Sequence, residues 1–414
     1  MTPIETHDVV VVGGGPSGAT AAHDLALSGV DVAMLDRAGR IKPCGGAIPP
    51  RLVKDFHIPD EMIVARIKSA RMIAPSEKSV DMPIDGGYVG MVDREHFDEW
   101  LRARAALAGA TRIAGTFRRI ERDDDGVAVV VYQPRAAQSS AAGDEDSSAE
   151  EAADGPERRI RALCVIGADG ALSKVGRQCV PGADKLPYVF AYHEIIASPE
   201  AESGAAFDGQ RCEVYYQGKL SPDFYAWVFP HGATTSVGVG SANKGFSLKG
   251  AVKDLRATSG MAQCKTVRKE GAPIPLKPLK RWDNGRDVVL AGDAAGVVAP
   301  ASGEGIYYAM LGGRLAARAA SQFLATGDAK RLALARKWFM ADHGRVFWVL
   351  GLLQHFWYRN DKRRERFVSM CRDKDVQRLT WDSYMNKELV KRQPTAHVRV
   401  FLKDLSHLFG LVRP

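Results

Sequence analysis

A glycine-rich turn near the start of the chain has the residue types and spacing of a phosphate-binding loop. Residues 13–18 are Gly-Gly-Gly-Pro-Ser-Gly, so that Gly13, Gly15 and Gly18 fit GxGxxG directly after the apolar run 8–12. The first glycine permits the tight turn, the second lets the backbone approach a pyrophosphate, and the third allows close helix–strand packing. The amides at the start of the following helix favour phosphates. We therefore expect a dinucleotide here.

An acidic residue stands where a ribose contact is expected. Asp36 follows Gly18 by 18 residues and ends an expected strand over 31–35, where its carboxylate can hold a ribose hydroxyl. A lone GxGxxG is a weak indication, but strand, helix and acid together predict dinucleotide binding. The sequence Val-Gly-Val-Gly at 237–240 imitates a second glycine motif, yet it lies in a β-rich region, and we interpret it as a strand.

Three further positions indicate which dinucleotide binds. An expected strand at 288–290 runs into Gly292-Asp293, similar to the second FAD signature of the p-hydroxybenzoate-hydroxylase class, where the acid binds the ribityl chain. Asp169, in Gly-Ala-Asp-Gly, resembles the middle motif of that class, although a turn acid at a strand end explains it too. Arg94 matches the arginine that flanks the flavin in these proteins. The resemblance implies FAD, which any nicotinamide cofactor must approach without a Rossmann domain of its own.

Two more stretches resemble the signatures of the geranylgeranyl reductase family. They are residues 42–47, Lys-Pro-Cys-Gly-Gly-Ala, and residues 222–230, Pro-Asp-Phe-Tyr-Ala-Trp-Val-Phe-Pro. The similarity is closest to the geranylgeranyl diphosphate/geranylgeranyl-bacteriochlorophyll reductases of phototrophic bacteria, and only the acidic stretch 135–157 is unmatched. It implies an FAD- and NADPH-dependent oxidoreductase of bacteriochlorophyll and chlorophyll biosynthesis. Such enzymes reduce three double bonds of a geranylgeranyl group to phytyl, on geranylgeranyl-bacteriochlorophyll a or on geranylgeranyl diphosphate.

The chemistry of an isolated alkene requires a proton as well as a hydride, because no carbonyl polarises the double bond. Cys44, on a loop expected beside the isoalloxazine, is a candidate proton donor or positioning group, since a free thiol is largely protonated at neutral pH. A small loop residue packed beside the flavin is an equally good interpretation. The proton donor therefore stays open at this point.

Alternating aromatic residues form the candidate substrate surface. Tyr225, Trp227 and Phe229 share one face of an expected strand, and such a face suits a polyisoprenoid chain. The Tyr225 hydroxyl could bind water or substrate. Aromatic stripes on strands are more often plain core, and it is the motif match that favours the functional interpretation.

The expected site residues follow from the motifs and the resemblance. The catalytic candidates are Cys44 and Tyr225, and the substrate-binding candidates are Tyr225, Trp227, Phe229 and Pro230. The cofactor-binding candidates are Gly13, Gly15, Pro16, Ser17, Gly18, Asp36, Arg37, Cys44, Gly45, Gly46, Arg94, Asp169, Gly292, Asp293, Gly303, Gly305 and Ile306. No metal site is expected, because the six cysteines are scattered without a CxxC pair.

The elements that must position these residues predict the α/β fold class. Taken over the whole chain, the expected arrangement is α+β. Helices are expected over 16–28 and 93–110, and a hairpin over 113–132. We predict an FAD-binding Rossmann-like domain of the p-hydroxybenzoate-hydroxylase type, an antiparallel β-sheet substrate domain and a helical C-terminal region. The first covers 1–60, 90–185 and 276–330, the second 61–89 and 186–275, and the third 331–414. Residues 135–157 are Ala, Ser, Gly, Asp and Glu almost throughout, with no apolar period, and predict a disordered insertion.

Charge and hydropathy indicate where the protein works. The net charge is +8, and residues 331–414 hold 18 Lys and Arg against 8 Asp and Glu, so the remainder is slightly acidic. Nucleic acid is therefore not an expected partner. No run of 18 uncharged apolar residues and no signal-peptide pattern occur, which predicts a cytoplasmic protein.

The aromatic stretch 346–358, followed by Lys362, Arg363, Arg364 and Arg366, predicts peripheral contact with the cytoplasmic face of the photosynthetic membrane. A buried helix that ends in a solvated basic turn explains the same residues.

Two other functions remain possible on this scaffold. An FAD-dependent aromatic monooxygenase shares the fold and all three FAD motifs, and the two reductase-like stretches argue against it. A non-catalytic prenyl carrier would not need the intact Asp36, Asp293 and glycine turn. The order of the three reductions, the choice between pigment-bound and free substrate, and the oligomeric state do not follow from the sequence.

Overall fold

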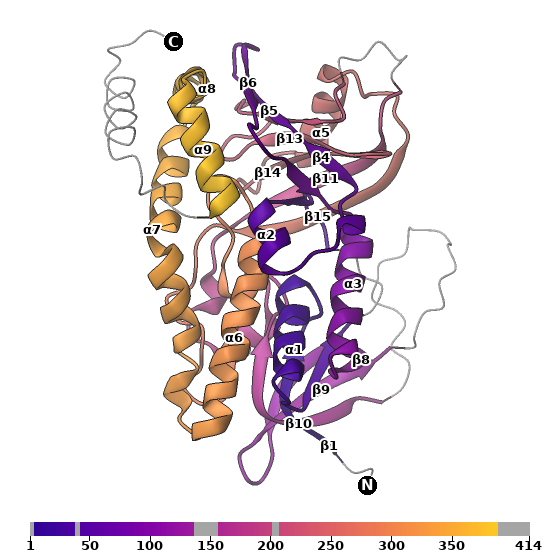
Figure 1. Cartoon of the computed structure of the whole chain (residues 1–414), viewed down its shortest axis with the longest axis vertical. Helices are drawn as coiled ribbons and strands as arrows, with labels where there is room; N and C mark the ends of the chain where they lie inside the picture. Colours follow the sequence, from indigo (N-terminus) through magenta and orange to yellow (C-terminus); the bar gives the residue numbers. More distant parts are fainter. Residues whose placement is uncertain (1–3, 38–41, 136–155, 201–206, 388–414) are drawn as a thin grey trace. The chain divides into compact units, whose positions relative to one another are not determined.

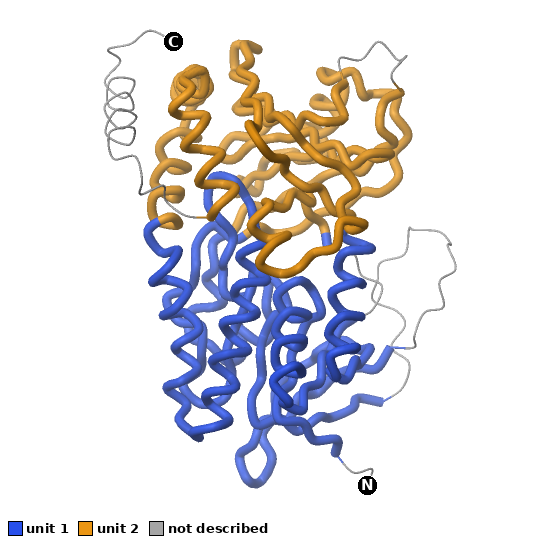
Figure 2. Tube along the Cα trace, viewed as in Figure 1, with its two compact units in different colours: residues 1–42, 94–187, 275–345 blue, residues 43–93, 188–274, 346–414 orange. Residues whose placement is uncertain are grey.

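The chain folds into two compact units in the computed structural model, which describes residues 4–37, 42–135, 156–200 and 207–387. Unit 1 comprises residues 1–42, 94–187 and 275–345, and unit 2 comprises residues 43–93, 188–274 and 346–414 (Figure 2). Most of the predicted disordered insertion over 135–157 lies outside the described residues, so this disorder stays a prediction.

Unit 1 is built on a parallel sheet. Five strands pair in parallel in the order β8-β2-β1-β10-β16, and β9 pairs antiparallel with both β8 and β10. Val9 to Val12 are at most 2% exposed, as a central strand covered on both faces requires. The predicted hairpin is confirmed as β8–β9. The bounds are β1 Glu5–Val12, β2 Val32–Asp36, β8 Thr111–Arg122, β9 Ala128–Pro134, β10 Arg158–Gly167 and β16 Val288–Leu290.

The helices of unit 1 pack through small residues. The predicted first helix is confirmed as α1 (Pro16–Leu27), and it lies beside α3 (Arg94–Leu107) and α6 (Ile306–Thr326) (Figure 1). Pro16 suits the start of a helix because its φ is preset and its missing amide hydrogen is not needed there. A Cβ on Gly313 would lie 2.1 Å from the Ser17 carbonyl oxygen, so glycine is what lets α6 approach α1. The short helix α4 (Lys174–Cys179) follows β10.

Unit 2 is built on a seven-stranded sheet in the order β15-β11-β14-β13-β12-β5-β6. The expected antiparallel arrangement is correct except for one pair, since β5 runs parallel to β12. These two strands lie far apart in the sequence, and only such a long connection permits parallel pairing. The bounds are β5 Ser69–Ile73, β6 Ser79–Pro83, β11 Tyr188–Ala197, β12 Arg211–Tyr215, β13 Ala226–His231, β14 Thr234–Ser241 and β15 Thr266–Pro275.

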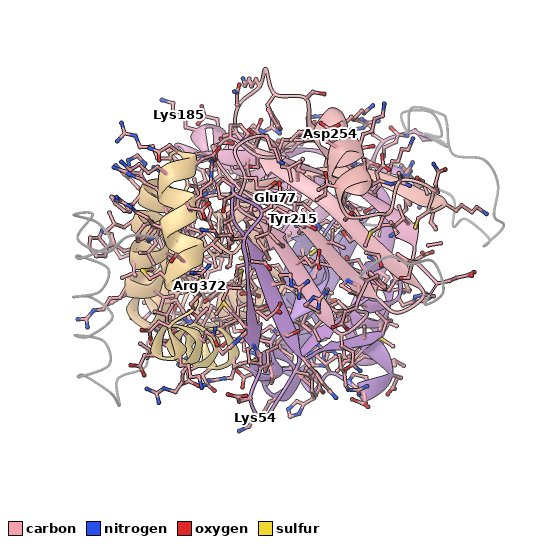
Figure 3. All side chains as sticks on the ribbon, turned by 90° about the horizontal axis from the view of Figure 1, so that it is seen from above. Lys54, Glu77, Lys185, Tyr215, Asp254 and Arg372 are labelled. Atoms are coloured by element: carbon pink, nitrogen blue, oxygen red, sulfur yellow. The ribbon has the colours of Figure 1, made fainter. Side chains whose placement is uncertain are left out.

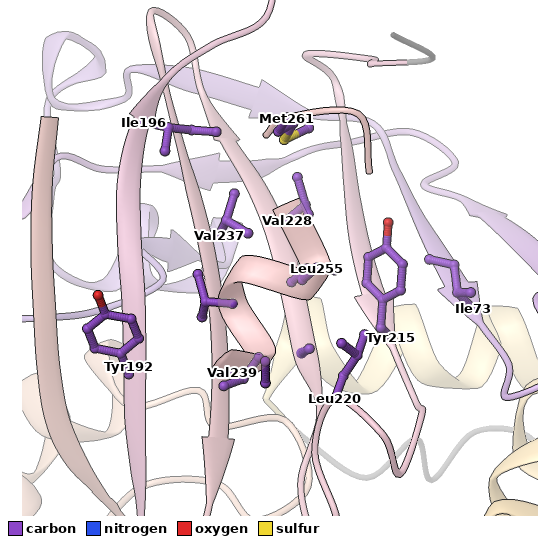
Figure 4. Close-up of a cluster of buried hydrophobic side chains, with 13 residues drawn as sticks. Ile73, Tyr192, Ile196, Tyr215, Leu220, Val228, Val237, Val239, Leu255 and Met261 are labelled. Atoms are coloured by element: carbon purple, nitrogen blue, oxygen red, sulfur yellow. The ribbon is translucent and has the colours of Figure 1, made fainter. Parts of the chain in front are cut away.

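One face of this sheet carries a hydrophobic core under helix α5 (Leu248–Thr258), which Figure 3 shows with Asp254 labelled. Val237, Val239 and Leu255 meet in this core, together with Ala226 and Val228 of β13 (Figure 4). Because side chains alternate along a strand, Tyr225, Trp227 and Phe229 belong to the opposite face. Strand β13 thus turns aliphatic side chains toward this core and aromatic side chains to the opposite face.

The expected domain boundaries need two corrections. Residues 43–60 group with unit 2, because β3 (Ala47–Ile48) pairs with β7 (Val89–Met91), which also pairs with β4 (Ala65–Ile67) and carries residues 90 and 91 into unit 2. The C-terminal helices do not form a separate region, since the boundary between the units falls inside α7 after Arg345. The remaining helices are α2 Pro50–Asp55, α7 Leu334–Trp357, α8 Asp361–Met370 and α9 Lys374–Asn386.

Helices α8 and α9 pack within unit 2 on elements from the first quarter of the chain. Glu365 accepts a hydrogen bond from the Ser76 hydroxyl at 2.6 Å, and Gln377 donates to the Asp81 carbonyl at 3.3 Å. Trp381 and Tyr384 pack against a cluster that includes Ile67 and Met91. Within the described ranges, no helix is both long and apolar enough to cross a membrane.

Candidate active site

The glycine turn in unit 1 has the geometry expected for its first and third glycines. Gly13 has φ +108°, and a Cβ there would lie 2.4 Å from the Ala168 carbonyl oxygen. A Cβ on Gly18 would lie 1.8 Å from the Gly13 carbonyl oxygen. Both contacts are with backbone atoms, which cannot shift without distorting the chain. Any side chain at these two positions would therefore displace the turn or the helix.

The second glycine of the turn leaves space for a ligand. Among the residues that the structure describes, a Cβ on Gly15 would meet nothing within 4 Å, and no side chain caps α1. Ser17 is 6% exposed, and its Oγ has no hydrogen-bond partner among the described residues. Because buried hydroxyls are nearly always paired, this one indicates an acceptor supplied by a ligand. The open space, the helix start without a side-chain cap and the buried hydroxyl without a described partner fit the pyrophosphate of FAD.

The predicted ribose acid lies against this turn. Asp36 accepts a hydrogen bond from the Gly14 amide at 3.2 Å, and the Arg102 guanidinium lies 3.4 Å from its second oxygen. Arg102 is buried and also pairs with Glu99 at 2.9 Å. Arg102 was not predicted as a site residue, because the sequence indicates only that it lies in an amphipathic helix. Arg37, the next cofactor candidate, is exposed.

The second FAD signature meets the start of α1. Gly292 has φ +63°, and a Cβ there would lie 2.7 Å from the Ser17 Cβ. Asp293 is 9% exposed and forms an ion pair with Lys42. Lys42 belongs to the stretch 42–47, but its pairing with an acid 251 residues away carries no sequence signal. The candidates Gly303 and Gly305 precede α6, which begins at Ile306.

Two cofactor candidates have structural partners of their own. The Asp169 carboxylate accepts hydrogen bonds from the Lys174 amide at 2.7 Å and the Val175 amide at 3.1 Å, the first two amides of α4 after its N-cap Ser173. Burial raises the pKa of this carboxyl. Arg94 is buried and donates two hydrogen bonds to Asp98, at 2.8 and 2.7 Å. A flavin contact by Asp169 or Arg94 stays a prediction.

In unit 2, the rings of the aromatic candidates adjoin one another and are largely buried. The ring centroids of Tyr225 and Trp227 lie 6.0 Å apart, and those of Trp227 and Phe229 lie 6.1 Å apart. Pro230 is buried, but alternation along β13 puts it on the opposite face, with Ala226 and Val228, so a substrate contact by Pro230 stays a prediction. Burial raises the pKa of Tyr225 far above its ordinary value, so its hydroxyl stays protonated at neutral pH. We call Tyr225, Trp227 and Phe229 the aromatic face.

The cysteine loop lies directly on this aromatic face. A Cβ on Gly45 would lie 3.1 Å from the Phe229 ring, and one on Gly46 would lie 2.4 Å from His231 Nε2. Gly46 has φ +73°, and its amide donates to the Cys44 sulfur at 3.4 Å. The structure thus brings both catalytic candidates into one part of unit 2, although 181 residues separate Cys44 from Tyr225 in the sequence.

His231 also lies in this part of unit 2, and it was not predicted as a site residue. Its Nδ1 lies 2.9 Å from the Phe229 carbonyl oxygen and donates to it, and burial lowers its pKa. It is therefore neutral at pH 7 and supports the loop through packing and neutral hydrogen bonds. Its position directly after the Phe-Pro of residues 229–230 was the only available signal.

Comparison with known proteins identifies the family. Residues 6–48 match the FAD binding domain family. A geranylgeranyl diphosphate reductase of Rhodobacter capsulatus is 56% identical over 408 residues, which cover 99% of this chain and 99% of that protein. The chloroplastic geranylgeranyl diphosphate reductase of Oryza sativa is 36% identical and is matched over 97% of this chain and 86% of its own length.

The chain belongs to the geranylgeranyl reductase family.

Solved structures confirm the predicted fold class. A geranylgeranyl bacteriochlorophyll reductase-like protein of Thermoplasma acidophilum superimposes with a TM-score of 0.78 at 21% identity, over 95% of this chain and all of that one. A flavin-dependent brominase superimposes with a TM-score of 0.71 at 16% identity, over 98% of this chain and all of that one. Similarity at these identities concerns the fold alone. This geranylgeranyl reductase family member is therefore an FAD-binding protein with the flavin hydroxylase fold.

A buried arginine anchors the loop that leads to the aromatic face of this family member. Arg364 is 2% exposed and donates to the Tyr358 carbonyl at 2.6 Å and to the Pro222 carbonyl. It also pairs with Asp361, which accepts the Gly218 amide at 2.8 Å. The prediction that Arg364 belongs to an exposed basic cluster was therefore wrong. Its buried guanidinium donates hydrogen bonds to backbone carbonyls and pairs with Asp361.

Replacing this arginine is expected to destabilise unit 2. Arg364→Ala would leave the Tyr358 and Pro222 carbonyls without their donor and lower the free energy of unfolding by about 3 kcal/mol. Lys362→Ala, two residues away and exposed, is the matched control, with an expected change of about 0.5 kcal/mol or less. Urea unfolding followed by circular dichroism measures both. Equal losses in the two variants would contradict the anchoring role.

Proposed function

We propose that this protein uses NADPH and FAD to reduce three double bonds of a geranylgeranyl group to phytyl, in bacteriochlorophyll biosynthesis. The substrate would be geranylgeranyl-bacteriochlorophyll a or geranylgeranyl diphosphate. The observation that carries the proposal is the packing of the Cys44 loop on the aromatic face, in a chain 56% identical to a protein named geranylgeranyl diphosphate reductase. That name and the two signatures favour alkene reduction over aromatic hydroxylation.

The residues of unit 1 have distinct roles toward FAD in this proposal. Gly15 and the first turn of α1 would hold the pyrophosphate, Ser17 would donate to it, and Asp36 would accept from the adenosine ribose. Asp293 would accept from the ribityl chain. Once reduced by NADPH, bound FAD would supply the hydride for the alkene.

The residues of unit 2 would supply the proton and the binding surface. Cys44 would donate its thiol proton to the second alkene carbon, and the Gly46 amide on its sulfur would stabilise the thiolate left behind. The Tyr225 hydroxyl, protonated at neutral pH, would donate a hydrogen bond to water or to a polar substrate group. Trp227 and Phe229 would pack against the isoprenoid chain, whose transfer from water is favourable.

Anaerobic turnover tests this function. The protein would be incubated with NADPH and either geranylgeranyl diphosphate or geranylgeranyl-bacteriochlorophyll, and the products analysed by mass spectrometry. Successive gains of two hydrogens, up to three times, are expected. NADPH consumption that requires oxygen and yields a hydroxylated product would instead establish a monooxygenase. A flavin that NADPH does not reduce would contradict the choice of electron donor.

We also propose that the protein acts as a peripheral protein on the cytoplasmic face of the photosynthetic membrane. Within unit 2, Trp348 and Leu352 of α7 are 69% and 55% exposed, and their spacing of four residues puts them on one side of the helix. Arg359 and Lys362 are exposed shortly after it. Exposed apolar groups beside cations suit the headgroup boundary, where a tetrapyrrole with a C20 tail would reside.

Vesicle binding is therefore expected to depend on these cations. Reversing the charge of Arg359 and Lys362 together should weaken co-sedimentation with anionic vesicles about thirtyfold at low salt, at ~1 kcal/mol per cation lost. The same change at Lys249 and Lys253, exposed on α5, is the matched control and should have little effect. Binding that survives the first pair of changes, or an unmodified protein that does not bind, would remove the membrane proposal.

A further inference from the structure

Beside the rings of the aromatic face, on the same side of the sheet, lies a buried chain of polar groups that the proposed chemistry does not use. The Trp227 indole N–H donates to the Ser236 hydroxyl oxygen at 3.1 Å, and the same oxygen lies 2.9 Å from His193 Nδ1. His193 Nε2 lies 3.0 Å from a Glu270 carboxylate oxygen. Trp227, Ser236 and His193 are at most 5% exposed. Polar groups buried this deeply are costly unless they are paired.

The donor of the first hydrogen bond follows from indole chemistry. An indole nitrogen can only donate, so the Ser236 oxygen accepts from Trp227. His193 Nδ1 is the second partner of this oxygen, and His193 Nε2 lies beside Glu270. Burial by itself would raise the pKa of Glu270, yet its contacts with His193 and Arg268 lower it overall. The chain thus ends on a carboxylate that is held ionised.

Packing also constrains this indole. A Cβ on Gly238 would lie 2.3 Å from the Trp227 ring and 2.5 Å from the His193 Cβ. The His193 and Trp227 ring centroids are 6.1 Å apart. The indole therefore lies over a position that only glycine leaves free, and the hydrogen bond to Ser236 selects its orientation in that space.

We propose that Ser236, His193 and Glu270 are positioning residues that hold the Trp227 indole in one orientation. A fixed indole would allow the isoprenoid chain to bind in a new position for each successive reduction. This inference rests on the proposed function. Trp227 is the middle ring of the aromatic face, and a change of its rotamer changes the surface that the chain meets. Each of the three reductions must place a different double bond at the same catalytic group. A loosened indole should therefore release the chain after one or two reductions.

The test compares two variants on adjacent positions of β14. Ser236→Ala removes the hydroxyl that Trp227 needs, whereas Thr235→Val removes a buried hydroxyl that bonds Ser198 at 2.8 Å on the other face. Ser236→Ala should raise the ratio of partly reduced to fully reduced product about tenfold, the effect of one lost buried hydrogen bond. Ser236→Thr, which keeps the oxygen, should restore the ratio, and Thr235→Val should leave it unchanged.

A second measurement reports on the indole without any substrate. In protein labelled with nitrogen-15 at tryptophan, Trp227→Phe identifies the Trp227 indole resonance, which Ser236→Ala should shift and Thr235→Val should not. A resonance unmoved by Ser236→Ala, or equal product ratios in Ser236→Ala and Thr235→Val, would overturn the positioning role in an active protein. A parent protein that reduces no geranylgeranyl substrate, with the expected indole shift still present, would overturn the proposed function and the role in chain reduction that rests on it.

Discussion

Asp293→Ala is expected to purify largely without FAD. The Asp293 carboxylate is 9% exposed and pairs with Lys42, so its removal takes away the proposed ribityl acceptor and leaves a cation beside the cofactor site without its partner. Hydrogen bonds to charged groups contribute about 1.5–3 kcal/mol each, which corresponds to roughly 10- to 100-fold weaker FAD binding. The ratio of flavin to protein absorbance after purification measures the loss.

Two further variants separate the causes of such a loss. Asp283→Ala removes another buried acid of unit 1, which accepts the Gly285 amide at 2.9 Å, and it should retain FAD. Asp293→Asn keeps an acceptor oxygen but not the charge, and intermediate occupancy would assign part of the binding to the charge itself. If Asp293→Ala purifies with full flavin occupancy, the placement of the second FAD signature is wrong.

Cys44→Ala is expected to keep its flavin and lose alkene reduction. General acid catalysis contributes about 10²- to 10⁴-fold, so turnover of the geranylgeranyl substrate should fall by that factor. Reduction of the flavin by NADPH needs no proton from this thiol and should change little. Stopped-flow measurement of the visible flavin band follows the first process, and mass analysis of the product follows the second.

The control for this variant uses another thiol of unit 2. Cys264 is also half-buried, and Cys264→Ala makes the same chemical change away from the aromatic face, so it should leave both rates intact. Near-normal alkene turnover in Cys44→Ser would argue for a packing role of Cys44. Parallel losses of flavin reduction and alkene reduction in Cys44→Ala would likewise contradict a proton-donor role.

The sequence alone determined the features that depend on neighbouring residues. The turn at Gly13 to Gly18, the helix that begins at Pro16 and the alternation of Tyr225, Trp227 and Phe229 were all predicted, and the structure shows each of them. Backbone freedom of glycine and the periods of helices and strands are local properties. The signatures at 42–47 and 222–230 likewise led to the family, because their residues are contiguous.

Only the tertiary structure decided which distant residues meet. The parallel pairing of β5 with β12, the pair of Lys42 with Asp293, and the contact of the Cys44 loop with Phe229 each join residues more than 100 positions apart. Arg364 was assigned to the surface by its charge and is instead buried, because carbonyl oxygens and Asp361 surround it. Local patterns limit which side chains can be buried, but long-range packing chooses their partners, and those partners define the chemistry of each part of the site.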